Sequence, residues 1–364
     1  MQSGQSRRGR CRARLRTRAL MGAPAPWWPL LGVLVAFGLP LCGLAFSRGR
    51  TPAERWERVQ GLAALGAVRQ VVAGQGAGQM AVYAVIERWG VFRSEDDGLE
   101  WRPVNRLPRG PLGRVDVESL ALAPDDPWAL VAGLAGQPTA SLPAVYKTRD
   151  GGRSWVPRRG VDTQGFEALA AAPGSVVYAA GRGHLYRSGD GGDTWLEAGG
   201  CPVDGSVLAA AVDPASGVLY LGTRGAGLWL TADRGATWNR ALPGRLVYAI
   251  APAQGGRVYA GTEDGLQSSA DGGASWRPLP PSAPRGQAVA LAVQAGPPDR
   301  LYLALAGRPL EYSGDGGATW HALHRPPVWA QVTALALDLR SSRDLFVGTD
   351  QGLWHCALPQ EDGL

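Results

Sequence analysis

The sequence predicts an all-β fold, a seven-bladed β-propeller of four-stranded blades preceded by one N-terminal transmembrane or signal segment. Three observations predict it. A Ser/Thr-x-Asp-x-Gly-x-x-Trp motif occurs six times, with 38 to 54 residues between successive aspartates. Short apolar or alternating runs surround each copy and are separated by Gly, Pro and Asp, which is typical of antiparallel strands. One uncharged stretch of 20 residues lies near the N-terminus.

The N-terminal region begins with a basic tail at residues 1–26, which has seven arginines and no acid within its first 20 residues. Removing these seven charges turns the formal net charge of the chain from +6 into −1, so the basic balance belongs to the tail and predicts no nucleic-acid partner. Residues 27–46 are uncharged and match one bilayer crossing. Because arginines are denser on their N-terminal side, we expect the tail in the cytoplasm and the later residues outside it.

Two readings of residues 27–46 stay open at the sequence level. One is an uncleaved signal-anchor, which makes the chain a single-pass protein of the cytoplasmic membrane with the propeller outside the cytoplasm. The other is a cleaved signal peptide with Gly43-Leu44-Ala45 as its cleavage site, in which case the propeller is secreted. A start at Met21 would remove most of the basic tail. Residues 47–55 form a linker in either case.

The motif defines one blade in each repeat. An apolar run comes first, a Leu/Val-Tyr run second, a third run enters the motif, and a fourth begins at the motif tryptophan. Four strands with a period near 40–45 residues are the signature of a propeller blade. The Ser, Thr and Asp side chains can accept hydrogen bonds from the backbone amides of the turn, and Gly can adopt the positive φ that the turn requires. The Trp ring is expected to pack between neighbouring sheets. The residues concerned are Asp96, Asp150, Asp190, Asp233, Asp271 and Asp315, with Trp101, Trp155, Trp195, Trp238, Trp276 and Trp320. Six equivalent copies favour a structural role for these aspartates over a catalytic one.

A seventh repeat lacks the motif and its fourth strand. Residues 332–337, 345–348 and 352–355 supply three strands, and the chain then ends. The sequence at Trp56-Glu-Arg-Val resembles the runs that follow the motif tryptophans, so we expect residues 56–62 to complete the last blade and remove an exposed sheet edge. The predicted propeller therefore spans residues 56–358, followed by a C-terminal tail at 359–364.

These repeats resemble the BNR, or Asp-box, repeats of sialidases, sortilin-type receptors, two-propeller xyloglucanases and the photosystem II assembly/stability factor family. A single propeller of about 300 residues behind an N-terminal membrane segment is most similar to the photosystem assembly factors and their non-photosynthetic bacterial relatives. The resemblance implies a non-catalytic, exported scaffold or assembly/stability factor that binds a protein client, for instance in a membrane complex. In the photosystem factors an arginine-rich face holds the client.

The loops expected opposite the motifs are rich in arginine. Guanidinium groups match carboxylates in geometry and charge, so these loops are the predicted client-binding surface. Its residues are Arg106, Arg109, Arg114, Arg159, Arg182, Arg224, Arg245, Arg285, Arg308 and Trp329. The same loops also carry acids such as Glu263, Asp264 and Asp350. The competing explanation for the arginines is therefore that they are ordinary solvent-exposed side chains without a binding role.

The alternative function is a carbohydrate-active enzyme, sialidase-like or another glycoside hydrolase, or a glycan-binding protein. Glycoside hydrolysis needs two carboxyl groups about 5–9 Å apart. Glu263, Asp264 and Asp350 are in the appropriate class of loop, but no motif pairs them. The four histidines and the cysteines show no metal-ligand spacing, so the sequence predicts no metal and no cofactor.

Overall fold

The computed structural model describes residues 55–358 except for 63–64, 77–78, 105, 108–109, 112–116, 135–143, 162–165, 182, 202–205, 324–329 and 338–343. The chain divides into a unit of Met1–Gly49 and a unit of Arg50–Leu364, and all described residues belong to the second. The predicted basic tail, the membrane or signal segment and the C-terminal tail lie outside the described residues. Among those that are described, no helix has the length and apolar character needed to cross a membrane.

The described residues form seven four-stranded antiparallel sheets, which confirms the predicted seven blades. Blade 1 has β2 (Val68–Gly76), β3 (Gln79–Ile86), β4 (Gly90–Ser94) and β5 (Arg102–Pro103). Blade 2 has β8 (Val117–Ala123), β9 (Asp126–Leu134), β10 (Val145–Thr148) and β11 (Val156–Arg158), and blade 3 has β12 (Ala168–Ala172), β13 (Val176–Gly181), β14 (His184–Ser188) and β15 (Leu196–Gly200). Blade 4 has β16 (Val207–Val212), β17 (Leu219–Thr223), β18 (Leu228–Thr231) and β19 (Asn239–Ala241).

The remaining blades follow the same order. Blade 5 has β20 (Val247–Pro252), β21 (Val258–Thr262), β22 (Gly265–Ser269) and β23 (Arg277–Pro278), and blade 6 has β24 (Ala288–Gln294), β25 (Arg300–Leu305), β26 (Leu310–Ser313) and β27 (His321–Ala322). Blade 7 combines β28 (Val332–Leu337), β29 (Asp344–Thr349) and β30 (Gly352–Ala357) with β1 (Arg55–Arg58). A two-stranded ribbon, β6 (Arg106–Leu107) with β7 (Gly110–Pro111), lies in the connection between blades 1 and 2.

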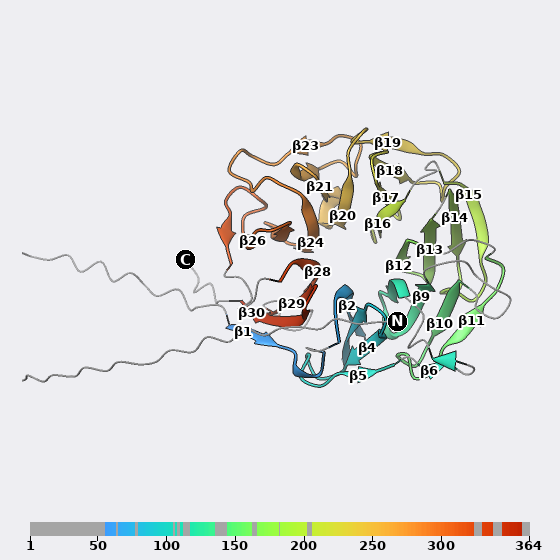
Figure 1. The fold of residues 1–364 in the computed structure, drawn as a ribbon. Coiled ribbons are helices and arrows are strands. Elements are labelled where there is room, and N and C mark those ends of the chain that lie inside the picture. The colour runs from blue at the N-terminus through green and yellow to red at the C-terminus, as the bar shows by residue number, and fades with distance from the viewer. Residues whose placement is uncertain are drawn as a thin grey trace, which may run out of the picture. The chain divides into compact units, whose positions relative to one another are not determined.

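The blades form a ring with their first strands innermost, as the labels of β2, β12, β16, β20, β24 and β28 show in Figure 1. Successive strands within each blade are antiparallel. The turns between first and second strands and the motif turns therefore lie at one end of the ring, which we call the motif face. The turns between second and third strands and the connections between blades lie at the other end, which we call the connection face.

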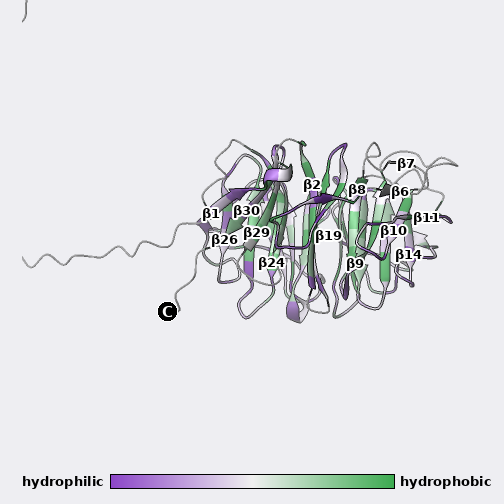
Figure 2. Ribbon diagram, turned by 90° about the horizontal axis from the view of Figure 1, so that it is seen from below, coloured by the Kyte–Doolittle hydropathy of each residue, from purple (hydrophilic) through white to green (hydrophobic). Residues whose placement is uncertain are grey.

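The core lies between neighbouring blades. One cluster joins Tyr83 and Val85 of blade 1 to Leu130 and Trp155 of blade 2. Hydrophobic residues follow the strands in Figure 2, while the turns at both ends are more hydrophilic. Each blade therefore buries its apolar surface against the next one, which explains why the ring has to close.

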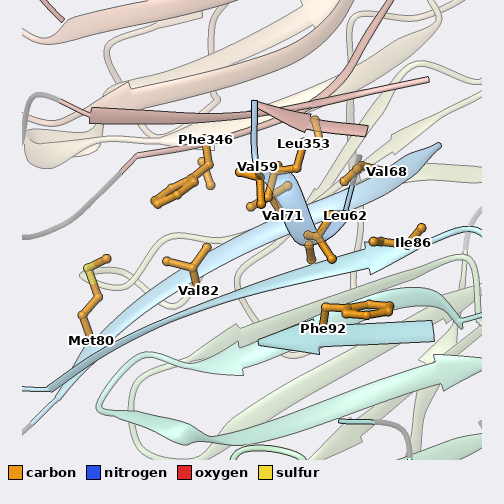
Figure 3. Packing of buried hydrophobic residues seen from close by; sticks show 13 residues of the cluster. Val59, Leu62, Val68, Val71, Met80, Val82, Ile86, Phe92, Phe346 and Leu353 are labelled. Atoms are coloured by element: carbon orange, nitrogen blue, oxygen red, sulfur yellow. The ribbon is translucent and has the colours of Figure 1, made fainter. Parts of the chain in front are cut away.

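The N-terminal strand closes the ring. β1 pairs antiparallel with β30, with Trp56 opposite Cys356. The strand is shorter than the predicted 56–62, because Gln60–Leu62 forms a 3-10 turn instead. This turn places Val59 and Leu62 against Val68 of blade 1 and residues of blade 7 (Figure 3), where both are almost fully buried. The segment thus completes blade 7 and also packs against blade 1.

The motif side chains hold the hairpins between third and fourth strands. In each of the six copies, the aspartate Oδ1 accepts a hydrogen bond from the backbone N–H of the residue four positions later, with N···Oδ1 distances of 2.8 to 2.9 Å. Hydroxyl donors from Thr237, Ser275 and Thr319, together with the backbone N–H groups, lower the pKa of Asp233, Asp271 and Asp315 to about 2. These carboxylates are therefore ionised acceptors within their own turns.

Candidate functional site

The structure describes five of the ten residues of the predicted client-binding surface: Arg159, Arg224, Arg245, Arg285 and Arg308. All five lie in turns between second and third strands or in connections between blades, and therefore belong to the connection face. Arg109, Arg114, Arg182 and Trp329 lie outside the described residues, as does the side chain of Arg106.

Four of these arginines follow one another along blades 4 to 6. Arg224 forms an isolated β-bridge with Leu246, and the carbonyl of Arg245 accepts the N–H of Gly227 from the same turn at 3.1 Å. Further along, Ala306 donates its N–H to the carbonyl of Gln287 at 2.9 Å, which joins the segment after Arg285 to the turn that carries Arg308. Arg159 lies apart, at the end of blade 2.

A cleft of about 360 Å³ opens between Arg245 and Arg285. Its lining includes Asp264, Gln267, Pro280 and Pro284. Arg245 donates from Nη1 to Oδ2 of Asp264 at 2.5 Å and is already paired. Arg285 is exposed and forms no ion pair with any residue that the structure describes. The cleft therefore has at its rim a guanidinium that forms no ion pair within the described part of the chain.

The acids of the enzyme alternative take part in backbone contacts. Oε2 of Glu263 accepts the N–H of Leu246 at 2.7 Å, and Oδ1 of Asp350 accepts the N–H of Gln331 at 2.8 Å. Both bonds tie a turn to the neighbouring connection. Glu311 was not predicted as a site residue. Burial raises the pKa of Glu311, although Arg308 lowers it in part.

Sequence reasoning also missed two buried cations that join blades. Arg93 donates from Nη1 to the carbonyl of Gly151 in the next blade at 2.6 Å. Its guanidinium also lies over the ring of Trp128, 5.1 Å from the centroid. Lys147 donates from Nζ to the carbonyl of Asp190 at 3.0 Å and to Oδ2 of Asp193 at 2.7 Å. Both residues directly precede the motif Ser or Thr in the sequence, and this common position could have indicated a common role.

The comparisons with known proteins concern the fold. No protein-family model matches the sequence, and no curated protein sequence does so either. Among solved structures, YCF48 bound to a D1 peptide is similar, with a TM-score of 0.64, 16% identity, and coverage of 84% of this chain and 97% of that one. YCF48 from Cyanidioschyzon merolae gives a TM-score of 0.61, 18% identity and coverage of 82% and 98%.

A GH74 xyloglucanase from Xanthomonas campestris also shares the fold. Its TM-score is 0.64 at 22% identity, over 83% of this chain and 53% of the enzyme, so the present chain spans about half of that protein. All three similarities show that the chain has the architecture of these propellers.

Proposed function

We propose that this protein is a non-catalytic scaffold or assembly factor that binds an acidic segment of a client protein on its connection face. The observation that carries the proposal is the series of arginines along blades 4 to 6, in which Arg224 and Arg285 are exposed and have no ion-pair partner among the described residues. Guanidinium groups in this state are available to bind carboxylates in a bidentate manner.

The fold similarity supports the same function. YCF48 binds a D1 peptide in one of the similar structures, and the similarity covers 97% of that chain. The enzyme alternative has less support here, because Glu263 and Asp350 bind backbone amides and the chain covers about half of the xyloglucanase.

Charge reversal of the arginine series tests the proposal. The full chain is used as bait in native membranes with cross-linking, the captured protein is identified, and its acidic segment is synthesised for affinity measurements. The variant with Arg224→Glu, Arg285→Glu and Arg308→Glu is expected to bind this peptide at least about tenfold more weakly, because each lost charged contact contributes roughly 1 kcal/mol or more. Its melting temperature should change little, since these side chains are exposed.

The matched control reverses three exposed arginines away from the connection face: Arg102→Glu, Arg149→Glu and Arg153→Glu. It changes the net charge by the same amount and should retain peptide binding. An equal loss of peptide affinity in both variants would mean that net charge alone causes the effect, and would refute a binding site on the connection face. Release of products from sialosides or β-glucans by the purified protein would favour the enzyme alternative.

We propose in addition that residues 27–46 hold the propeller outside the cytoplasm. The support is the uncharged length of this segment and the arginine-rich tail before it. A protease added to intact spheroplasts is expected to digest the propeller, and sequencing of the mature N-terminus separates anchor from cleaved signal. Protection of the propeller until the cells are lysed would contradict the proposed topology.

A further inference from the structure

One position in the blades contributes to filling the gap to the next blade. It is the third-strand residue directly before the motif Ser or Thr, and its side chain points to the following blade, as Arg93 and Lys147 show. At the corresponding position Leu230 packs in the cluster between blades 4 and 5. Tyr312 contacts Tyr302 in the cluster between blades 6 and 7, with 5.2 Å between ring centroids. In blade 5 the residue is Ser268, the smallest side chain at this position in the motif-bearing blades.

The small side chain of Ser268 leaves a cleft between blades 5 and 6. This Ser268 cleft has a volume of about 580 Å³, within the range of ordinary small-molecule sites. It lies toward the motif face, since its lining includes Asp299 from the first turn of blade 6 and Gly316 from the motif of that blade. It is therefore separate from the arginine series of the connection face, although residues 278–280 line both clefts.

The charged groups of the Ser268 cleft are two arginines and one acid. Arg257 donates from Nε to Oδ2 of Asp299 at 2.6 Å and from Nη2 to Oδ1 at 2.8 Å. The Asp299 carboxylate also accepts the Tyr259 hydroxyl at 3.0 Å and the Gly296 N–H at 2.9 Å. This pair of the buried Asp299 and the partly exposed Arg257 is neutral overall, and the four hydrogen bonds to the Asp299 carboxylate fix that side chain in place.

Arg277 supplies the net charge of the Ser268 cleft. It is exposed on β23 and forms no ion pair with any described residue. The motif acids Asp271 and Asp315 are bound within their own hairpins and do not line the cleft. Among its described lining residues, the cleft thus presents one guanidinium without a counter-charge next to a fixed neutral pair.

The rest of the lining is mostly apolar. It includes Ala270, Pro278, Leu279, Pro280, Pro298 and Ala318, together with Ser268 and Ser269. Proline, leucine and alanine side chains favour an apolar group, while a single guanidinium favours a single negative charge.

We infer that the Ser268 cleft binds a small organic monocarboxylate with an apolar body. The carboxylate pairs with Arg277 and the apolar body lies against the proline-rich wall. This activity is additional to client binding and does not depend on it.

Fluorine NMR of 4-fluorophenylacetate with the full chain in nanodiscs measures this binding. Broadening of the ligand signal by the wild-type protein is expected, and Arg277→Ala should weaken the affinity at least about tenfold. Ser268→Leu, which copies the residue of blade 4, should weaken binding because the larger side chain takes up part of the cleft. Arg102→Ala is the matched control, since Arg102 follows the motif tryptophan of blade 1 as Arg277 does in blade 5 and is paired with Glu100 there.

Several results would overturn the inference. These are the absence of binding to the wild-type protein, an unchanged affinity in Arg277→Ala, or an equal loss in Arg102→Ala. Equal binding of 4-fluorophenylacetamide, or displacement of the probe by inorganic phosphate at the same concentration, would exclude a carboxylate site. If Ser268→Leu fails to fold, the comparison of Arg277→Ala with Arg102→Ala still decides, because both side chains are exposed.

Discussion

A variant that begins at residue 63 is expected to melt at least about 10 °C below a variant that begins at residue 51. The first lacks β1 and the buried residues Val59 and Leu62, which are 5% and 0% exposed. Burial of these two side chains alone contributes roughly 3–6 kcal/mol, and a domain of this size loses about 2–4 °C per kcal/mol. Loss of the β1–β30 pairing adds to this and exposes a sheet edge that invites aggregation.

The measurement is thermal unfolding followed by circular dichroism, with aggregation monitored by light scattering. The variant from residue 51 is the control, since it keeps β1 and the 3-10 turn. Leu62→Ala in the full chain separates packing from strand pairing and should cost about 2–5 kcal/mol. Equal melting temperatures for the two truncated variants would show that blade 7 is stable with three strands, contrary to a ring closed by the N-terminal segment.

The repeat explains why most of the fold could be predicted from the sequence. Six copies of one motif in register define six blades, and the alternation of strand directions then assigns every turn to one of two faces. The closure was predictable because Trp56 begins a run like those after the motif tryptophans. The end of β1 at Arg58 was not, because the chain turns at Gln60–Leu62 and buries Leu62 against Val68 of blade 1, a long-range contact that the run itself does not indicate.

The candidate sites depend on information that the repeat does not contain. Topology assigns Arg245 and Arg285 to the same face, but only the structure shows that Asp264 pairs with the first. Likewise, the motif aligns Ser268 with Arg93 and Lys147 in the sequence, but only the structure shows that the latter two side chains bind the next blade and that a cleft lies beside Ser268. Asp299 lies in a turn rich in Gly and Pro, where a sequence reader expects a solvated acid, and yet its side chain is 1% exposed.

Replacement of Trp155 by alanine is expected to have the largest effect among the motif tryptophans. Its ring is 0% exposed within the cluster that joins blades 1 and 2, and its Nε1 donates to the carbonyl of Val104 at 2.6 Å. Truncation of a buried tryptophan costs about 3–5 kcal/mol, and the carbonyl of Val104 also loses its donor. Denaturant unfolding of Trp155→Ala should therefore show a loss of at least about 3 kcal/mol in the free energy of unfolding.

Trp238 is the matched control, because its Nε1 also donates to a carbonyl of the preceding blade, that of Gly200, at 3.1 Å. Its ring is half-buried, so Trp238→Ala retains more of the native packing and should cost clearly less than Trp155→Ala. Trp155→Phe keeps most of the ring but removes the donor, and should fall between the two alanine variants. An equal loss in the free energy of unfolding for both alanine variants would mean that the tryptophans stabilise only their own hairpins. A larger loss for Trp155→Ala would mean that packing between blades determines how much each tryptophan contributes to stability. The contribution would then vary around the ring with the burial of each tryptophan.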